Sequence, residues 1–144
     1  MPNHMTVRQR SRAMKAVKLK DGPLELLIRR ELRKRGLRFQ KNCKRLHGSP
    51  DIVFLKQRVV IFIDGDFWHG WRLPSWQHKL SDFWKEKLKT NRKRDRRNFR
   101  RLRAANWKVI RLWEHEIRAD KTLCVTRILR ALKLPVTYAL RRRR

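Results

Sequence analysis

Cysteine, acidic residues and long apolar runs are all scarce in this sequence of 144 residues. Its two cysteines, Cys43 and Cys124, lie far apart and outside any C-x-x-C pair, so neither a disulfide framework nor an evident zinc site is predicted. No apolar run approaches the ~20 residues that a membrane-spanning helix needs, and no signal-peptide pattern opens the chain. We therefore expect a soluble, intracellular protein with no membrane partner.

The shortage of acidic residues leaves a large positive charge. Twelve Asp and Glu stand against 41 Lys and Arg, which gives a formal charge of +29. A compact protein with this charge repels itself unless a polyanion lies nearby, so nucleic acid is the expected partner. The composition argues against a fully disordered polycation, because 40% of the residues are hydrophobic and six Trp and six Phe are available for a core.

The spacing of apolar residues predicts one domain of alternating helices and strands. We expect helices over residues 24–35, 81–105 and 121–132, with Gly36 as the left-handed residue after the first. Two strands over 51–55 and 58–63 are joined by a tight turn in the manner of a hairpin, and further strands cover 37–40 and 107–113. An aromatic-rich loop spans 65–77. This order predicts an α/β sandwich.

The chain divides into three predicted parts. A basic arm or short helix covers residues 1–20, and the folded domain covers 21–135. A basic tail covers 136–144, beginning after Pro135, which stops the last helix.

One end of the predicted hairpin gathers groups that suit a metal ion. Asp51 begins the first strand, and Ile63 and Asp64 end the second, so antiparallel pairing brings them together. A carboxylate in this place is a good ligand for Mg²⁺, which prefers oxygen donors. The alternative is that Pro50 and Asp51 only form a turn before the strand.

Three other residues are candidates for catalysis. His69 lies in the aromatic loop, and its imidazole is suited to accept a proton from water near neutral pH. Asp95 interrupts the apolar face of the helix over 81–105, where an unpaired charge is costly, so it either pairs with an arginine or orients an imidazole such as His69. Glu25 opens a helix, where the dipole already favours a carboxylate; it has a catalytic role only if the fold brings it to Asp51.

Two further groups of residues predict contact with DNA. Residues 85–103 contain eleven basic and two acidic residues, a density that favours phosphate contacts over a merely solvated face. The predicted phosphate contacts are Arg92, Lys93, Arg94, Arg96 and Arg97. Phe67 and Trp68, on a loop between glycines, are either wedges inserted between base pairs or ordinary core residues.

Six groups of residues, taken in order, resemble the very-short-patch-repair (Vsr) endonuclease family over about residues 6–117. The Phe-Trp-His, Arg-Asp-Arg-Arg and Trp-Glu motifs make this resemblance specific. The matching segments are residues 10–14, 23–25, 49–51, 62–69, 94–97 and 107–114.

The resemblance implies a restriction-endonuclease-like PD-(D/E)XK core, a mixed central sheet flanked by helices, with an N-terminal DNA-binding arm or helix. It implies an endonuclease that uses Mg²⁺, as two ions, to nick one DNA strand 5′ to the thymine of a T:G mismatch. It also implies a monomer in the cytoplasm or nucleoid of a prokaryote, or of phage-like origin, with double-stranded DNA and mismatch-repair proteins as partners.

Roles for individual residues follow from the same resemblance. Asp51 would be the main metal-binding carboxylate and the backbone carbonyl of Ile63 a further ligand. His69 would be the general base, Asp95 its orienting partner and Glu25 an accessory acid. The wedges beside the mismatch would be Met14, Phe67 and Trp68.

The sequence departs from the family at a structural zinc site. Where family members place Cys and His ligands, this chain has Asp66, Trp71, Leu73 and His115, so a closed set of four zinc ligands is missing. We predict no structural zinc, with Trp71 and Trp76 packing in its place and a contact between Asp66 and His115. Asp64 replaces a His of some members and is an additional candidate metal ligand.

Two alternatives remain beside a mismatch-specific nicking enzyme. The first is a sequence-specific or relaxed Vsr-like endonuclease of a homing or mobile-element type. The second is a non-catalytic basic module that binds nucleic acid. The presence of Glu25, Asp51, His69 and Asp95 argues against the second, because binding alone does not need these residues amid so much positive charge.

Overall fold

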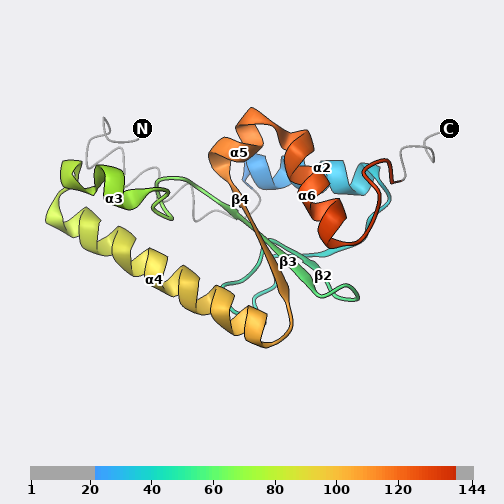
Figure 1. Ribbon diagram of the computed structural model, residues 1–144, viewed down its shortest axis with the longest axis horizontal. Helices are drawn as coiled ribbons and strands as arrows, with labels where there is room; N and C mark the ends of the chain where they lie inside the picture. The colour runs from blue at the N-terminus through green and yellow to red at the C-terminus, as the bar shows by residue number, and fades with distance from the viewer. Residues whose placement is uncertain (1–21, 139–144) are drawn as a thin grey trace.

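A four-stranded mixed sheet lies at the centre of the fold, with helices on both of its faces (Figure 1). The computed structural model of the chain describes residues 22–138. In spatial order, the strands are β1 (Gln40–Lys41), β2 (Ile52–Phe54), β3 (Val59–Asp64) and β4 (Lys108–Trp113). β2 pairs antiparallel with β1 and β3, whereas β3 and β4 are parallel. The predicted mixed α/β architecture is confirmed.

The helices begin and end where the local sequence favours it. They are α2 (Pro23–Lys34), α3 (Leu73–Trp76), the 3₁₀ turn η2 (Gln77–Lys79), α4 (Asp82–Ala104), α5 (Glu114–Ala119) and α6 (Lys121–Ala131). Gly36 follows α2 with a φ of +74°, as predicted. The side chains of Ser81 and Asp120 cap α4 and α6 by accepting backbone N–H groups of the first turn. No helix in the described part of the chain is both long and apolar enough to cross a membrane.

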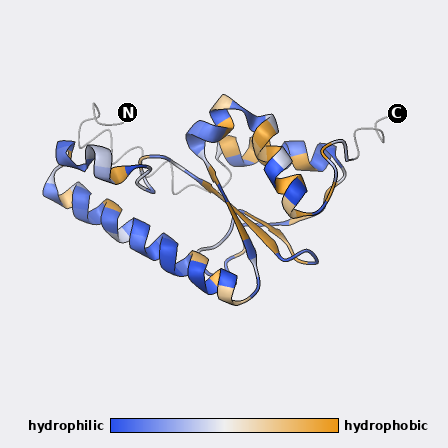
Figure 2. Ribbon diagram, viewed as in Figure 1, coloured by the Kyte–Doolittle hydropathy of each residue, from blue (hydrophilic) through white to orange (hydrophobic). Residues whose placement is uncertain are grey.

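The two faces of the sheet carry different cores. One face, here called the apolar face, packs against α2 and α6 through a large cluster that includes Ile28, Leu32, Ile61, Leu112 and Ile128. The other, here called the site face, packs against α4 through a smaller cluster: Cys43, Val53, Val60, Phe62, Phe99, Leu102 and Trp107. Figure 2 shows hydrophobic residues filling the strands, whereas α4 is hydrophilic along most of its length.

The structure differs from the sequence predictions at three places. The strand predicted over 37–40 is β1, only two residues long and shifted toward Lys41, because Leu37 and Phe39 pack on the apolar cluster instead of pairing. The loop predicted over 65–77 contains α3 and runs into η2. Helix α5 was not predicted. The predicted arm over residues 1–20 and the end of the tail lie outside the described residues.

Candidate active site

The polar residues of the site face come from neighbouring strands. Side chains alternate between the two faces along a strand, and Val53 and Phe62 point to the site face. The same alternation assigns Asp51 and Asp64 to this face, each two residues away along the chain. Arg111 joins them, because it pairs in register with Phe62 across the β3–β4 ladder.

Asp51 lies directly before β2 and contacts the end of β3. Its Oδ2 accepts a hydrogen bond of 2.6 Å from the backbone N–H of Ile63. Because the N–H and C=O of one strand residue point to the same side, the Ile63 carbonyl is directed toward the Asp51 side as well. Burial raises the pKa of Asp51 to about 8, with the charges of Glu25 and Asp64 adding to the effect and the Ile63 N–H and a nearby arginine opposing it.

Helix α2 brings Glu25 to Asp51. The charge of Glu25 is close enough to raise the pKa of Asp51, so the condition that the sequence left open is met. Arg29, only 1% exposed, donates to Glu25 Oε2 at 3.3 Å and to Asn42 Oδ1 at 3.1 Å. The backbone N–H of Asn42 donates to the carbonyl of Asp51 at 3.1 Å. A buried guanidinium therefore links the helix to the strand that carries Asp51.

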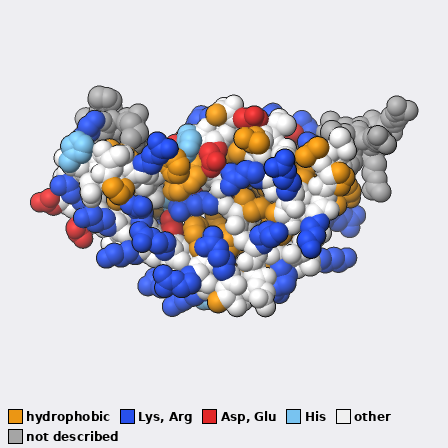
Figure 3. Space-filling view, viewed as in Figure 1, with side chains coloured by type: hydrophobic (Ala, Val, Ile, Leu, Met, Phe, Trp, Pro, Cys, Tyr) orange, Lys and Arg blue, Asp and Glu red, His pale blue; other side chains and the backbone are white. Residues whose placement is uncertain are grey.

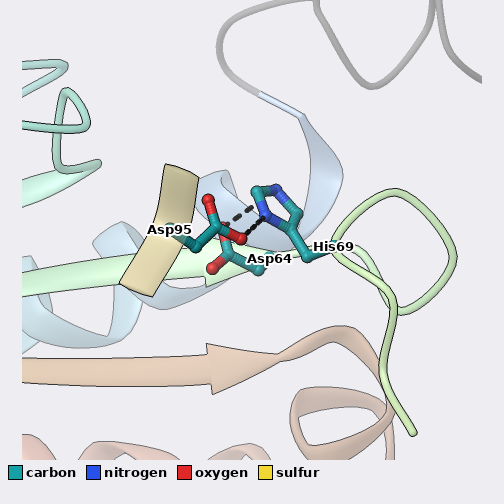
Figure 4. Close-up of side chains that lie close together, drawn as sticks. All are labelled: Asp64, His69 and Asp95. Carbon is teal, nitrogen blue, oxygen red and sulfur yellow. Dashed lines mark hydrogen bonds and ion pairs between the residues drawn. The ribbon is translucent and has the colours of Figure 1, made fainter. Parts of the chain in front are cut away.

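His69 lies between two carboxylates from different elements (Figure 4). Its Nδ1 is 2.7 Å from Oδ2 of Asp95 on α4, and its Nε2 is 3.3 Å from Oδ1 of Asp64 at the end of β3. Each ring nitrogen thus faces a carboxylate. The structure brings Asp95 to His69, one of the two arrangements that the sequence left open.

Arg111 contacts both of these carboxylates. Its Nε donates to Asp64 Oδ2 and its Nη2 donates to Asp95 Oδ2, both at 2.7 Å. Asp95 therefore pairs with an arginine and with His69 at once, so the two alternatives considered from the sequence are not exclusive.

The pKa values of Asp64 and Asp95 are shifted in opposite directions. Burial raises the pKa of Asp64, and the charges of His69 and Arg111 do not cancel this effect. Burial also raises the pKa of Asp95, but the hydrogen bond and charge of His69 and the charge of Arg111 outweigh it, so the pKa of Asp95 is lowered. An ionised Asp95 only accepts hydrogen bonds, so Nδ1 of His69 carries a hydrogen toward it. Nε2 is then the nitrogen that accepts a proton.

The loop that carries His69 is held at two places. Gly70 has a φ of +68°, and a Cβ added there would lie 2.9 Å from Cδ of Arg92, so the tight turn after His69 requires glycine. On the other side, the buried Asn91 of α4 donates from Nδ2 to the backbone carbonyl of Trp68 at 3.0 Å. These contacts fix the backbone on both sides of the imidazole.

Phe67 and Trp68 both pack against protein. The Phe67 ring stacks on Trp76 with 5.9 Å between centroids and meets Trp84 at its edge, at 5.5 Å. Trp68 is 9% exposed. The structure shows the core-packing arrangement, and insertion between base pairs stays a prediction that requires these rings to move. Met14, the third predicted wedge, lies outside the described residues.

Helix α4 carries the basic segment of the sequence. Lys and Arg side chains cover much of the face seen in Figure 3, with few acidic side chains among them. Of the five predicted phosphate contacts, only Arg94 lines the cavity around His69, and its Nη2 is 3.7 Å from Asp95 Oδ1. Arg92 packs against Gly70, and burial together with nearby arginines lowers its pKa. The other three, Lys93, Arg96 and Arg97, are exposed.

The contact predicted between Asp66 and His115 is present. Asp66 Oδ1 lies 2.8 Å from His115 Nδ1. The Trp71 ring covers His115 at 4.5 Å and Trp113 at 5.0 Å, and Trp76 Nε1 donates to the Trp71 carbonyl at 2.7 Å. The predicted packing of Trp71 and Trp76 is therefore also confirmed, and it joins the loop after β3 to the start of α5.

The candidate catalytic groups share one cavity of about 670 Å³. Within it, Asp51 and Glu25 form a partly buried acidic pair, and repulsion between them helps to raise the Asp51 pKa. A divalent cation would relieve this repulsion, and the two carboxylates with the Ile63 carbonyl offer the oxygen donors that Mg²⁺ prefers. Ligand atoms of Asp64, His69 and Asp95 also lie within 4.8 Å of one another. The guanidinium of Arg111 already occupies two of those carboxylates, so the Asp51 set fits Mg²⁺ better.

Three residues of the site were not predicted from the sequence: Arg29, Asn91 and Arg111. Asn91 could have been found, because it falls on the same buried stripe of α4 as Asp95. Arg29 stands four residues after Glu25, a spacing typical of a helical ion pair. Nothing in a chain with 41 Lys and Arg marks Arg111 before the strands are placed side by side.

Comparison with known proteins gives matches over most of the chain. The sequence model of the family described as DNA mismatch endonuclease Vsr matches residues 3–74. The type II nicking enzyme V.NmeAIP of Neisseria meningitidis serogroup A is 37% identical over 135 residues, which are 92% of this chain and 96% of that protein. V.NmeDIP, a type II nicking enzyme of serogroup C, is 31% identical over 137 residues, 91% and 90% of the two chains. The DNA mismatch endonuclease Vsr of Escherichia coli K12 is 34% identical over 119 residues, 79% of this chain and 74% of that protein.

Proposed function

This chain belongs to the Vsr family of DNA mismatch endonucleases, and we propose that it is a Mg²⁺-dependent enzyme that nicks one strand of duplex DNA beside a T:G mismatch in very-short-patch-type repair. The net charge of +29 supports DNA as the substrate. The names of the relatives, nicking enzymes and a mismatch endonuclease, support cleavage of one strand at a mismatch. The four-stranded mixed sheet, with acidic residues at the end of the β2–β3 hairpin, supports a PD-(D/E)XK-like core.

One observation carries the proposal of a nuclease. His69, held by Asp64 and Asp95, opens into the same cavity as Asp51 and Glu25. A base and a set of oxygen ligands are thus placed beside one space large enough for a phosphodiester. A module that only binds DNA would not need buried carboxylates in a protein that is otherwise strongly basic.

The metal site proposed here consists of Asp51 and the Ile63 carbonyl, with Glu25 as an accessory acid. Asp64 stays a further candidate, although both of its oxygens already face Arg111 and His69. These residues would hold Mg²⁺, proposed as two ions, and the metal would supply stabilisation of the negative charge that develops on the scissile phosphate.

His69 is the proposed general base. Asp95 holds the Nδ1 side of the ring at 2.7 Å, and Nε2, which lies 3.3 Å from Asp64 Oδ1, is the nitrogen proposed to take a proton from the attacking water. The water then attacks the phosphorus in line, the bond from phosphorus to the leaving sugar oxygen breaks, and that oxygen takes a proton from solvent. Asp95 acts as a positioning residue, because its carboxylate contacts the imidazole of His69 and the guanidinium groups of Arg111 and Arg94.

DNA contacts complete the proposal. Arg92, Lys93, Arg94, Arg96 and Arg97 are proposed to bind phosphates, and Met14, Phe67 and Trp68 to insert beside the mismatch. We propose that the protein acts as a monomer, with residues 1–20 as a DNA-binding arm, 21–135 as the nuclease domain and 136–144 as a basic tail. Mismatch-repair proteins are proposed as further partners.

Cleavage of defined duplexes tests this function. Wild type, Asp51→Ala and the control Asp82→Ala are incubated with Mg²⁺ and with duplexes that differ only in a T:G or a matched pair. Asp82 is a fully exposed acid in the first turn of α4, so it controls for the loss of one negative charge. We expect wild type and Asp82→Ala to nick only the T:G duplex, and Asp51→Ala to lose at least about 10²–10³-fold in rate.

Each other result has a distinct meaning. Equal cutting of both duplexes contradicts mismatch specificity and favours a sequence-specific or relaxed endonuclease. No cutting by wild type with Mg²⁺ or Mn²⁺ contradicts the enzyme assignment itself. Full activity of Asp51→Ala contradicts the proposed metal site.

A further inference from the structure

Arg111 is the residue that connects the two carboxylates on either side of His69. Its Nε contacts Asp64 Oδ2 and its Nη2 contacts Asp95 Oδ2, each at 2.7 Å. The same Oδ2 of Asp95 lies 2.7 Å from Nδ1 of His69. One guanidinium thus reaches the base through both of its carboxylate neighbours, because its hydrogen bonds go to Asp64 and Asp95 and not to the imidazole itself.

The position of Arg111 is set by packing rather than by solvent. Its guanidinium carbon lies 4.1 Å from the centre of the Trp113 ring and 5.0 Å from that of Phe99, so aromatic rings contact the group on two sides. The side chain is 23% exposed. Its backbone carbonyl accepts a hydrogen bond of 3.0 Å from Nη2 of Arg127 on α6, which fixes this edge of β4 as well.

Two carboxylates around one imidazole need such a group. Asp64 and Asp95 are both buried, and each negative charge raises the energy of the other. A planar guanidinium presents separate N–H groups to the two carboxylates, whereas a lysine ammonium is a single point of charge and cannot reproduce both contacts in the same geometry.

We propose that Arg111 is a positioning residue of the nicking reaction, which holds Asp64 and Asp95 in the arrangement that orients His69 and makes no contact with the DNA backbone. This inference rests on the proposed function of His69 as the base. It assigns to one arginine, among the many of a basic protein, a role that is distinct from phosphate binding.

The test compares Arg111→Lys and Arg111→Ala with Arg130→Ala, a matched loss of one exposed arginine on α6, on the opposite face of the sheet. Nicking of the T:G duplex gives kcat and KM, and fluorescence anisotropy with the same duplex gives Kd as a function of salt concentration. We expect both Arg111 variants to lose about 10²-fold in kcat, as for a displaced catalytic group. KM and Kd stay within about twofold of wild type, and the salt slope changes no more than it does in Arg130→Ala, well below the ~0.9 expected for the loss of one phosphate contact. Guanidinium ion added to Arg111→Ala restores part of kcat.

The opposite pattern overturns the inference. A higher KM and a smaller salt slope with unchanged kcat identify Arg111 as a phosphate contact. Full activity of Arg111→Lys shows that a positive charge is enough at this position and that separate N–H contacts with Asp64 and Asp95 are not required.

A readout without DNA separates this inference from the proposed function. In ¹⁵N-labelled protein, the Nδ1–H of His69 gives a slowly exchanging NMR signal if Asp95 holds it. We expect this signal in wild type and Arg130→Ala, and its loss in both Arg111 variants while the signals of Trp84 and Trp107 report an intact core. Persistence of the His69 signal in the variants contradicts the inference, whether or not wild type cuts DNA. If Arg111→Ala does not fold, Arg111→Lys decides.

Discussion

The apolar face and the site face of the central sheet use the same strands for different purposes. Ile61 and Phe62 are adjacent on β3, yet Ile61 points into a large cluster of apolar side chains, and Phe62 lies in register with Arg111. The apolar face carries the larger cluster and stabilises the fold by burying apolar surface. The site face gives up part of its apolar packing to hold Asp64, Asp95 and a guanidinium. The comparison shows that a small domain can hold a charged site on one face of its sheet when the other face supplies the core.

The largest expected effect comes from removing the base. His69→Ala should lower kcat about 10²–10⁴-fold, because no other imidazole lines the cavity among the described residues. The thermal midpoint should fall as well, because the ring is only 16% exposed and its loss removes a partner from two buried carboxylates. Single-turnover nicking and thermal unfolding measure the two quantities.

His78→Ala is the control for this prediction. His78 is an exposed histidine in η2, so its loss should leave nicking unchanged. An equal fall in kcat for both variants contradicts the assignment of His69.

A substitution on the apolar face should lower stability without changing activity. Ile61→Ala should lower the free energy of unfolding by about 2–5 kcal/mol, because Ile61 is fully buried and the cavity left behind cannot close completely. Urea unfolding measures this loss. The rate of nicking per folded molecule should stay close to wild type. Leu55→Ala, at an exposed position in the β2–β3 turn, is the control and should change stability little.

A smaller effect concerns stability and pH. Asp51 has a pKa of about 8 in the folded protein and an ordinary, lower pKa when unfolded, so the folded state binds the extra proton. Its contribution to stability is therefore complete at low pH and is lost as pH rises toward 8. In chelator, Asp51→Asn should raise the thermal midpoint by about 2–6 °C at pH 8, and by less at pH 5. A gain that shrinks as pH rises contradicts the raised pKa.

The smallest effect tests the basic helix. Arg94→Met should reduce the slope of log Kd against log salt by about 0.9, the value for one phosphate contact, because Arg94 lines the cavity. Anisotropy titrations between low and moderate salt measure the slope. Arg130→Met on α6 should leave it unchanged. An equal change in both variants shows that the slope reports only total charge.

Most of the fold could be predicted because its long elements have clear periodicity. The helix of residues 82–104 keeps one buried stripe over six turns, and the hairpin strands are rich in β-branched residues. The two-residue β1 and the six-residue α5 could not be predicted, because elements of that length show no period. What fixes them is tertiary contact: β1 is held by pairing with Ile52 and Val53, and α5 by the packing of Ile117.

The candidate site was predicted only in part, for a physical reason. Asp51, His69 and Asp95 stand out because an acid on an apolar stripe or a histidine among aromatics conflicts with its surroundings. Arg111 does not conflict with anything in its own segment. Its role comes from the parallel pairing of β3 with β4, a long-range contact that no local pattern encodes.

The pairing of β3 with β4 also determines when the site can assemble during synthesis of the chain. Val59 pairs with Lys108, so the parallel pairing of β3 with β4 forms only after the whole of α4 has been synthesised. A chain growing on the ribosome contains Asp51, His69 and Asp95 before Arg111 has been added, and domains fold as units once their sequence is available. The unfinished protein has the basic helix but not the assembled site. We therefore expect a nascent chain to be unable to nick DNA until β4 (Lys108–Trp113) has been synthesised.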